Sequence, residues 1–151
     1  MREQRFRVQR QAAAEPSVIY RLLADVPGWR KWFPLVGHAD FVRAGDAEPG
    51  GAGAIRRVGG MGFLDVEEQI LDARAPHYQR YTVLRGLPVS SYEAEVHIEP
   101  LGTGSALLWT GRFSASLPGV GPVLRVVLGS LIGMLSTALV TAAERHASQV
   151  D

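Results

Sequence analysis

The stretch from Pro122 to about Ser148 constrains the fold more than any other part of the chain. Between Val123 and Ala143 its only formal charge is Arg125, so the segment belongs either inside a protein or inside a membrane. Small or polar residues recur at every fourth position and large aliphatic residues fill the other side, which predicts a helix with two faces. The spacing of four is carried by Arg125, Gly129, Gly133, Thr137 and Thr141.

We expect this helix to form half of the core. About 25 residues at 1.5 Å each reach roughly 38 Å, enough to cover a small sheet. The side expected against the sheet holds Leu124, Val127, Leu128, Leu131 and Leu135, and Arg125, Thr137 and Glu144 are expected toward water, with Gly129 and Gly133 on the outer stripe.

A membrane span is the alternative interpretation of the same segment. The length suffices, and Gly129 and Gly133 form a pair of small residues four apart, as at helix contacts in bilayers. The polar stripe argues against a span, and so does the incomplete core that a span would leave behind. No integral membrane span is therefore expected.

Length and composition predict one domain over residues 1–151. The hydrophobic content of 46% and the charged content of 21% are those of a globular protein. With 16 basic and 15 acidic residues, the chain lacks the charge excess of a nucleic-acid-binding protein. The absence of cysteine excludes disulfides and thiol nucleophiles. The charged start of the chain does not resemble a secretory signal, and we expect a cytoplasmic location.

The remaining elements follow from periodicity and turn residues. Residues 4–12 alternate as a half-buried strand, and Pro16 suits the first position of a short helix over 16–24. Trp29 and Trp32 share one side of a second short helix that Pro34 closes. Further strands are predicted at 35–43, 54–58, 63–73, 77–84, 90–99 and 105–115, and the glycine-rich stretch from Gly45 to Gly53 is predicted as a loop. Short connections favour an antiparallel meander.

Two of these strands alternate well enough for their faces to be assigned. Tyr92, Ala94, Val96 and Ile98 oppose Glu93, Glu95, His97 and Glu99, and Leu107, Trp109 and Phe113 oppose Leu108, Thr110 and Arg112. The sheet is therefore expected to have one dry face and one wet face.

The order of elements and several motifs resemble the START-like superfamily, also called SRPBCC, and within it the bacterial polyketide cyclase/dehydrase or lipid-transport proteins. The resemblance rests on residues 26–34 (VPGWRKWFP), 54–57 (AIRR), 68–74 (EQILDAR), 78–81 (YQRY) and 107–109 (LLW). The glycines at 50–53 before the basic strand are also similar to the plant pollen-allergen ligand carriers.

This resemblance implies the fold class α+β with a helix-grip architecture. A seven-stranded antiparallel sheet would wrap around the long C-terminal helix, with two short helices between strands 1 and 2. An apolar cavity would lie between sheet and helix. The fold alone leaves the chemistry open, because one fold hosts carriers, cyclases and regulators.

Aromatic and aliphatic residues are the candidates for a ligand-binding site. An apolar or planar ligand needs such walls with a few polar anchors, although plain core filling explains the same residues equally well. The candidates are Trp29, Trp32, Phe33, Tyr81, Tyr92, Trp109, Phe113, Leu128, Leu131 and Leu135.

Polar residues with inward parity are the candidates for catalysis. Glu68 shares parity with Val66 and Ile70, and Arg57 with Ile55, while Tyr81 has apolar neighbours of its own parity. A charged group in a dry cavity is costly unless it is paired or meets a ligand. The alternative places Glu67, Glu68, Arg56 and Arg57 on the wet face or in pairs across strands, because a shift of one residue flips every side chain.

No metal or cofactor is expected. The four histidines, at 38, 77, 97 and 146, have no metal-ligand spacing, and the loop at 45–53 lacks the Gly-Lys-Ser/Thr of a phosphate cradle.

The expected function is binding of a small hydrophobic molecule (a lipid, polyketide or aromatic compound) by a monomer or homodimer. The alternative is a cofactor-independent polyketide aromatase/cyclase or dehydratase, and a third class is a membrane-associated or heterodimeric partner that uses the long helix. The cavity opening is expected between the Gly45–Gly53 loop, the Trp29–Pro34 segment and the turn from Leu117 to Pro122.

Overall fold

A computed structural model describes residues 2–60 and 64–150 of the chain. The elements run in the predicted order: β1 (Glu3–Ala12), α1 (Pro16–Ala24), η1 (Val26–Gly28), α2 (Trp29–Trp32), β2 (His38–Arg43), β3 (Ile55–Gly59), β4 (Asp65–Arg74), β5 (Tyr78–Arg85), β6 (Val89–Leu101), β7 (Gly104–Ala115) and α3 (Gly121–Val150). The predicted start of the fourth strand, residue 63, lies outside the described residues.

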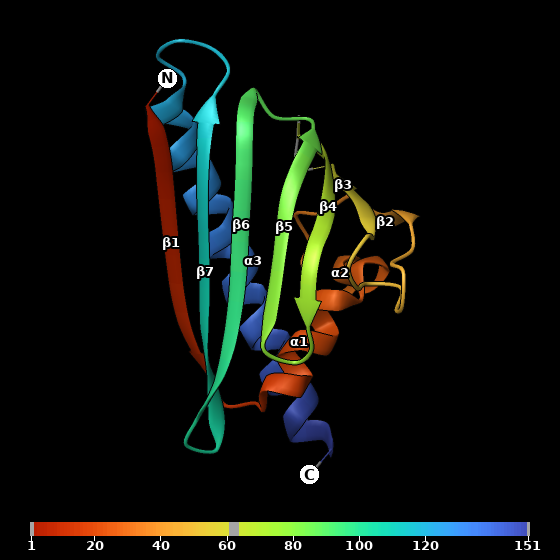
Figure 1. Cartoon of the computed structure of the whole chain (residues 1–151). Helices are drawn as coiled ribbons and strands as arrows, with labels where there is room; N and C mark the ends of the chain where they lie inside the picture. Colours follow the sequence, from red (N-terminus) through yellow and green to blue (C-terminus); the bar gives the residue numbers. More distant parts are fainter. Residues whose placement is uncertain (1, 61–63, 151) are drawn as a thin grey trace.

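The seven strands form one antiparallel sheet in the order β1-β7-β6-β5-β4-β3-β2. Consecutive strands from β2 to β7 are neighbours, and β1 closes the order by pairing with β7 along its whole length, from Glu3 opposite Ser114 to Ala12 opposite Ser105. Figure 1 shows α3 crossing behind this sheet, with α1 and α2 beside its lower part. The architecture is the predicted α+β helix grip.

The dry face of the sheet carries the predicted alternation. In β6 the side chains of Tyr92, Ala94, Val96 and Ile98 are buried, and in β7 those of Leu107, Trp109 and Phe113 are buried. Their alternate neighbours are half-buried or exposed. Strands of an antiparallel sheet with one covered face adopt this pattern, and the prediction of both faces is confirmed.

The predicted orientation of α3 is correct for its aliphatic side and partly correct for its polar stripe. Leu124, Leu128 and Leu135 are buried, and Val127 and Leu131 are half-buried. Arg125 and Thr137 are exposed as expected, whereas Gly129, Gly133 and Glu144 are half-buried beside the N-terminal segment.

Three contacts join that stripe to the first strand. Arg10 donates from Nε to the Thr137 hydroxyl (3.1 Å) and from Nη2 to the Gly133 carbonyl (3.2 Å). Glu144 accepts a hydrogen bond of 2.8 Å from the Ala13 amide. A Cβ on Gly129 would lie 3.8 Å from that of Phe6. The small residues therefore let α3 approach β1, and the polar residues satisfy polar groups there.

The outer face of α3 is consequently the one that holds Val123, Val126 and Met134, which are exposed. Within the described residues, α3 is also the one helix long and apolar enough to cross a membrane by length and composition. Because it packs against β1 and α1, α3 is a core helix of this fold.

Candidate functional site

An apolar chamber lies where α3, leaning toward β1, leaves space above the middle of the sheet. It has a volume of about 80 Å³. Its wall comes from α2, strands β3 to β7, the connections around them and the middle of α3: Trp29, Phe33, Val36, Arg56, Val58, Leu64, Val66, Glu68, Tyr81, Leu87, Tyr92, Trp109, Leu128, Leu131, Ile132 and Leu135. Mostly apolar walls with a few convergent polar groups are typical of ligand sites.

One ion pair in this wall is almost fully removed from solvent. Arg56 and Glu68 are opposite each other on β3 and β4, and Arg56 Nε donates to Glu68 Oε1 at 2.8 Å. The side chain of Arg56 is 1% exposed and that of Glu68 is 14% exposed. Removing one partner of such a pair costs about 3–5 kcal/mol, because the other charge stays buried without compensation.

The guanidinium of Arg56 is held from several sides. Its carbon lies 5.0 Å from the ring centre of Trp29 and 4.6 Å from that of Tyr81, and Nη1 reaches Gln79 Oε1 at 3.5 Å. Aromatic faces attract a cation more strongly where water is excluded. Arg56 is therefore fixed in place, and it holds the Glu68 carboxylate at the chamber wall.

Two tyrosines place phenol groups beside this pair. Trp109 Nε1 donates to the Tyr81 hydroxyl at 3.1 Å, and the rings of Tyr81 and Tyr92 are 6.2 Å apart. Burial, and next the Glu68 charge, raise the pKa of Tyr81. Burial, and next the Tyr81 and Glu68 charges, raise the pKa of Tyr92 well above its usual value. Both phenols stay protonated at neutral pH and are hydrogen-bond donors.

The chamber brings together eight of the ten predicted ligand-binding residues. Trp32 and Phe113 are outside its wall: Trp32 is half-buried beside Trp29, with ring centres 6.0 Å apart, and Phe113 stacks on Tyr92 at 6.1 Å within the core. The eight that line the chamber are Trp29, Phe33, Tyr81, Tyr92, Trp109, Leu128, Leu131 and Leu135.

Among the candidate catalytic residues, Glu68 and Tyr81 line the chamber and Arg57 does not. Arg57 points to the outer face, where Nη2 pairs with Asp65 Oδ2 at 2.6 Å. Its neighbour Arg56 takes the inward position, with Ala54 and Val58 of the same parity. The prediction paired Arg57 with Ile55, and Ile55 is only half-buried, so the strand was read one residue out of phase.

Of the two consecutive glutamates of β4, only one faces the interior. Glu67 lies on the other side of β4, where it pairs with Arg85. Glu68 and Arg56 are paired across adjacent strands, as the alternative interpretation allowed, but in the interior. The parity of Arg56 with Ala54 and Val58 was the sequence signal that pointed to it.

Of the three segments predicted around the opening, one lines the chamber. Trp29 and Phe33 line the chamber, but its wall includes no residue of the Gly45–Gly53 loop or of the turn from Leu117 to Pro122. Leu64 and Leu87, from the connections next to β4 and β5, line it instead. The glycine-rich loop packs on α1 instead, where a Cβ on Gly50 would lie 2.5 Å from the Ala24 carbonyl oxygen.

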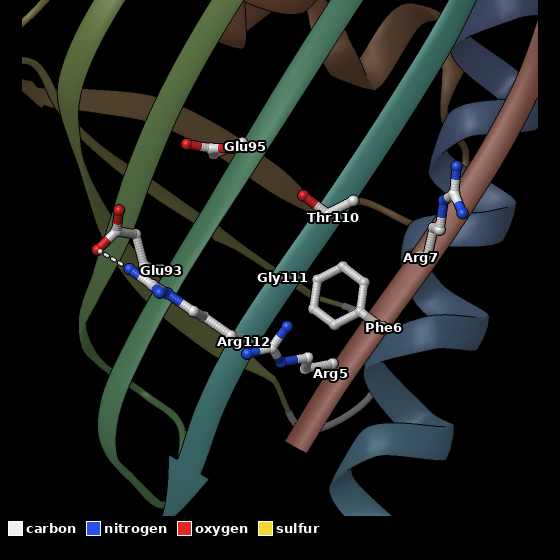
Figure 2. Close-up of a pocket in the computed structure, with 8 residues that line it drawn as sticks. All are labelled: Arg5, Phe6, Arg7, Glu93, Glu95, Thr110, Gly111 and Arg112. Atoms are coloured by element: carbon white, nitrogen blue, oxygen red, sulfur yellow. Dashed lines mark ion pairs between the residues drawn. The ribbon is translucent and has the colours of Figure 1, made fainter. Parts of the chain in front are cut away.

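A second hollow, of about 520 Å³, lies on the wet face across β1, β7 and β6 (Figure 2). Charged side chains dominate it, and Glu93 pairs there with Arg112 at 3.5 Å. Arg5 is exposed and pairs with Glu3. Such solvated pairs contribute about 1 kcal/mol or less. The chamber is smaller, but its mostly apolar lining makes it the stronger candidate for a ligand site.

The described residues hold no group of three histidine, aspartate or glutamate side chains that could bind a metal ion.

Comparisons with solved structures agree with this fold. A START superfamily protein from Mycobacterium smegmatis matches with a TM-score of 0.77 and 16% identity, over 97% of this chain and 99% of that one. A protein from Thermus thermophilus matches with a TM-score of 0.71 and 22% identity, over 98% and 99% of the two chains.

A plant enzyme has the same fold. A point mutant of norcoclaurine synthase from Thalictrum flavum, in complex with a transition-state analogue, matches with a TM-score of 0.77 and 14% identity over 96% of each chain. At these identities the likeness concerns the fold alone.

No curated protein sequence gives a significant match. The sequence model of one family, however, matches residues 3–147. This match covers nearly the whole chain, and with the helix-grip fold and its chamber it shows that the protein belongs to the polyketide cyclase/dehydrase and lipid transport family.

Proposed function

We propose that the protein binds a small, largely apolar molecule in the chamber between α3 and the sheet. The observation that carries this proposal is the composition of the wall, where aliphatic and aromatic side chains surround one ion pair and two tyrosine hydroxyls. Burial of the ligand's apolar surface would supply the affinity, at about 25 cal/mol per Å² before ordering costs. Glu68 and the hydroxyl of Tyr92 would orient a polar group of the ligand.

The chamber is smaller than the usual ligand pocket, so its volume must change when a ligand binds. Pockets for drug-sized ligands enclose about 300–1,000 Å³, whereas this chamber has about 80 Å³. Binding therefore includes a widening of the chamber. Leu131 and Ile132 of α3 are half-buried, so their rotamers change at a smaller packing cost than those of fully buried residues.

The test is binding of an uncharged fluorescent probe, N-phenyl-1-naphthylamine, to the purified protein and two variants. Leu131→Trp places a large ring at the chamber wall, and Met134→Trp adds the same ring to the exposed side of the same helix. The parent and Met134→Trp are expected to enhance the probe's fluorescence equally, and Leu131→Trp is expected to weaken binding tenfold or more. A parent protein that gives no enhancement, or two variants that behave alike, would contradict the proposal.

A catalytic role is the second candidate, and it is favoured by Glu68, the one carboxylate among the described residues that line the chamber. In a polyketide cyclisation, Glu68 would take the proton from a carbon between two carbonyls. The carbanion would then form a carbon–carbon bond to another carbonyl of the same chain, and that oxygen would receive a proton. Tyr81 and Tyr92 would donate hydrogen bonds to the oxygens that gain charge.

Glu68→Gln separates the two candidates by turnover, because the amide keeps the shape of the side chain and loses the base. For a carrier, neither the parent nor the variant turns over a poly-β-keto thioester. For a cyclase, turnover of a poly-β-keto thioester falls a hundredfold or more while probe binding is kept. The urea midpoint of each variant checks that it is folded.

A further inference from the structure

A separate groove lies outside the chamber, between α1, the loop of residues 44–54 and the turn that joins β4 to β5. It has a volume of about 830 Å³ and shares no lining residue with the chamber. We call it the outer groove; its lining includes Tyr20, Asp25, Phe41, Glu48, Pro49 and Pro76.

The loop that forms one wall of the outer groove is held by its own backbone. Asp46 N donates to the Ala52 carbonyl at 2.9 Å, Gly45 N to that of Pro49 at 3.0 Å, and Gly51 N to that of Glu48 at 3.0 Å. Gly50 has no room for a side chain against the backbone of Ala24. The groove is thus built by packed elements, and a ligand would not have to order this wall.

Tyr20 gives the outer groove a hydroxyl group that has no protein partner among the described residues. Its side chain is 8% exposed, and its hydroxyl makes no hydrogen bond within the described part of the chain. Burial, and next the charges of Glu48 and Asp72, raise the pKa of this hydroxyl.

The charges around the outer groove are mainly negative. Asp25, Asp46 and Glu48 line it together with one cation, Arg21. Asp46 is paired with Arg43 at 3.6 Å. Asp25 and Glu48 form no ion pair with any described residue. Two exposed carboxylates of the groove lining are therefore available to a ligand.

We propose that the outer groove is a second binding site, for a primary ammonium group attached to an apolar or aromatic body. The ammonium would donate hydrogen bonds to Glu48, Asp25 and the Tyr20 oxygen, and the body would lie on Phe41, Pro49 and Pro76. An anion is repelled by the two carboxylates, and a neutral alcohol gains no charge-assisted hydrogen bond. This site does not depend on the function of the chamber.

The test uses 2-phenylethylammonium, with 2-phenylethanol as the neutral probe of matched shape, and follows backbone amide shifts of the labelled protein by NMR. The ammonium is expected to shift amides of Ser17, Tyr20, Ala47 and Gly51, and the alcohol to leave them in place. Because ionic attraction is screened, raising the salt from about 0.05 to 0.3 M is expected to weaken binding severalfold.

Three variants test which residues bind the ammonium group. Glu48→Gln and Tyr20→Phe are each expected to weaken ammonium binding at least threefold. Glu99→Gln removes an exposed carboxylate of β6 and is expected to bind as the parent does. Equal binding of the alcohol, shifts confined to chamber residues such as Tyr81, or an equal effect of Glu99→Gln would each overturn the proposal.

Discussion

At the scale of single residues, the decisive feature is that Arg56 and Glu68 form a buried pair while Arg57 and Asp65 form an exposed one. The two arginines are consecutive, so β3 sends one to each face. Inside, Arg56 is enclosed by Trp29, Tyr81 and Glu68. Arg56 is thus a fixed part of the chamber wall, whereas Arg57 forms an ion pair on the surface.

The exposed pair makes a pH dependence testable. Hydrogen bonds from Arg57, together with one from His38, lower the pKa of Asp65 to about 2. Because the folded pKa lies below the unfolded value near 3.9, the stabilisation is complete above about pH 4 and is lost as the pH falls toward 2. Urea midpoints of the parent and Asp65→Asn are expected to differ at pH 5 and to converge near pH 2. A difference that stays constant over this range would exclude the linkage.

At the scale of elements, α3 shows how glycines set the distance between a helix and a strand. Its stripe of small residues was expected to face water, but Gly129 lies beside Phe6 and Gly133 beside Arg10. Phe6 in turn covers Gly111 of β7, as Figure 2 shows. Two glycines therefore contact Phe6. Gly129 of α3 leaves room for a methyl group beside Phe6, and Gly111 of β7 does not.

Two substitutions distinguish these glycines. A Cβ on Gly129 would meet Phe6 at 3.8 Å, which is ordinary contact, so Gly129→Ala is expected to stabilise the protein by about 0.5–1 kcal/mol through helix propensity. A Cβ on Gly111 would overlap the Phe6 ring, and Gly111→Ala is expected to destabilise by about 1–3 kcal/mol. The free energies of unfolding in urea measure both. The same sign for both changes would show that α3 and β7 do not pack on Phe6 in this way.

At the scale of the whole molecule, the fold changes the acidity of every tyrosine. All four tyrosines, Tyr20, Tyr78, Tyr81 and Tyr92, have raised pKa values, in each case with burial as the largest cause. Two of them line the chamber and one lines the outer groove. The sites and the stability at high pH are therefore linked.

This linkage predicts alkaline unfolding. The unfolded chain loses its phenol protons near pH 10, whereas the folded chain keeps them to higher pH, so stability is expected to fall as the pH rises above 10. Phenolate absorbance and circular dichroism are expected to change together in the parent, and urea-unfolded protein is expected to titrate near pH 10. Ionisation of all four tyrosines near pH 10 with the dichroism intact would be the contrary result.

Local patterns in the sequence determined the order of the elements, the dry faces of β6 and β7 and the long helix, because these depend on side chains of one segment. The cytoplasmic location and the monomeric or dimeric state stay predictions. Tertiary structure alone decided which arginine of β3 points inward, which side of α3 meets β1 and which segments line the chamber. These depend on partners distant in the chain: Arg56 needs Glu68 and Trp29, and the α3 stripe needs Arg10. Burial of a polar side chain is costly unless a partner forms a hydrogen bond or ion pair with it, so the position of the partner decides whether that side chain lies in the interior or in water.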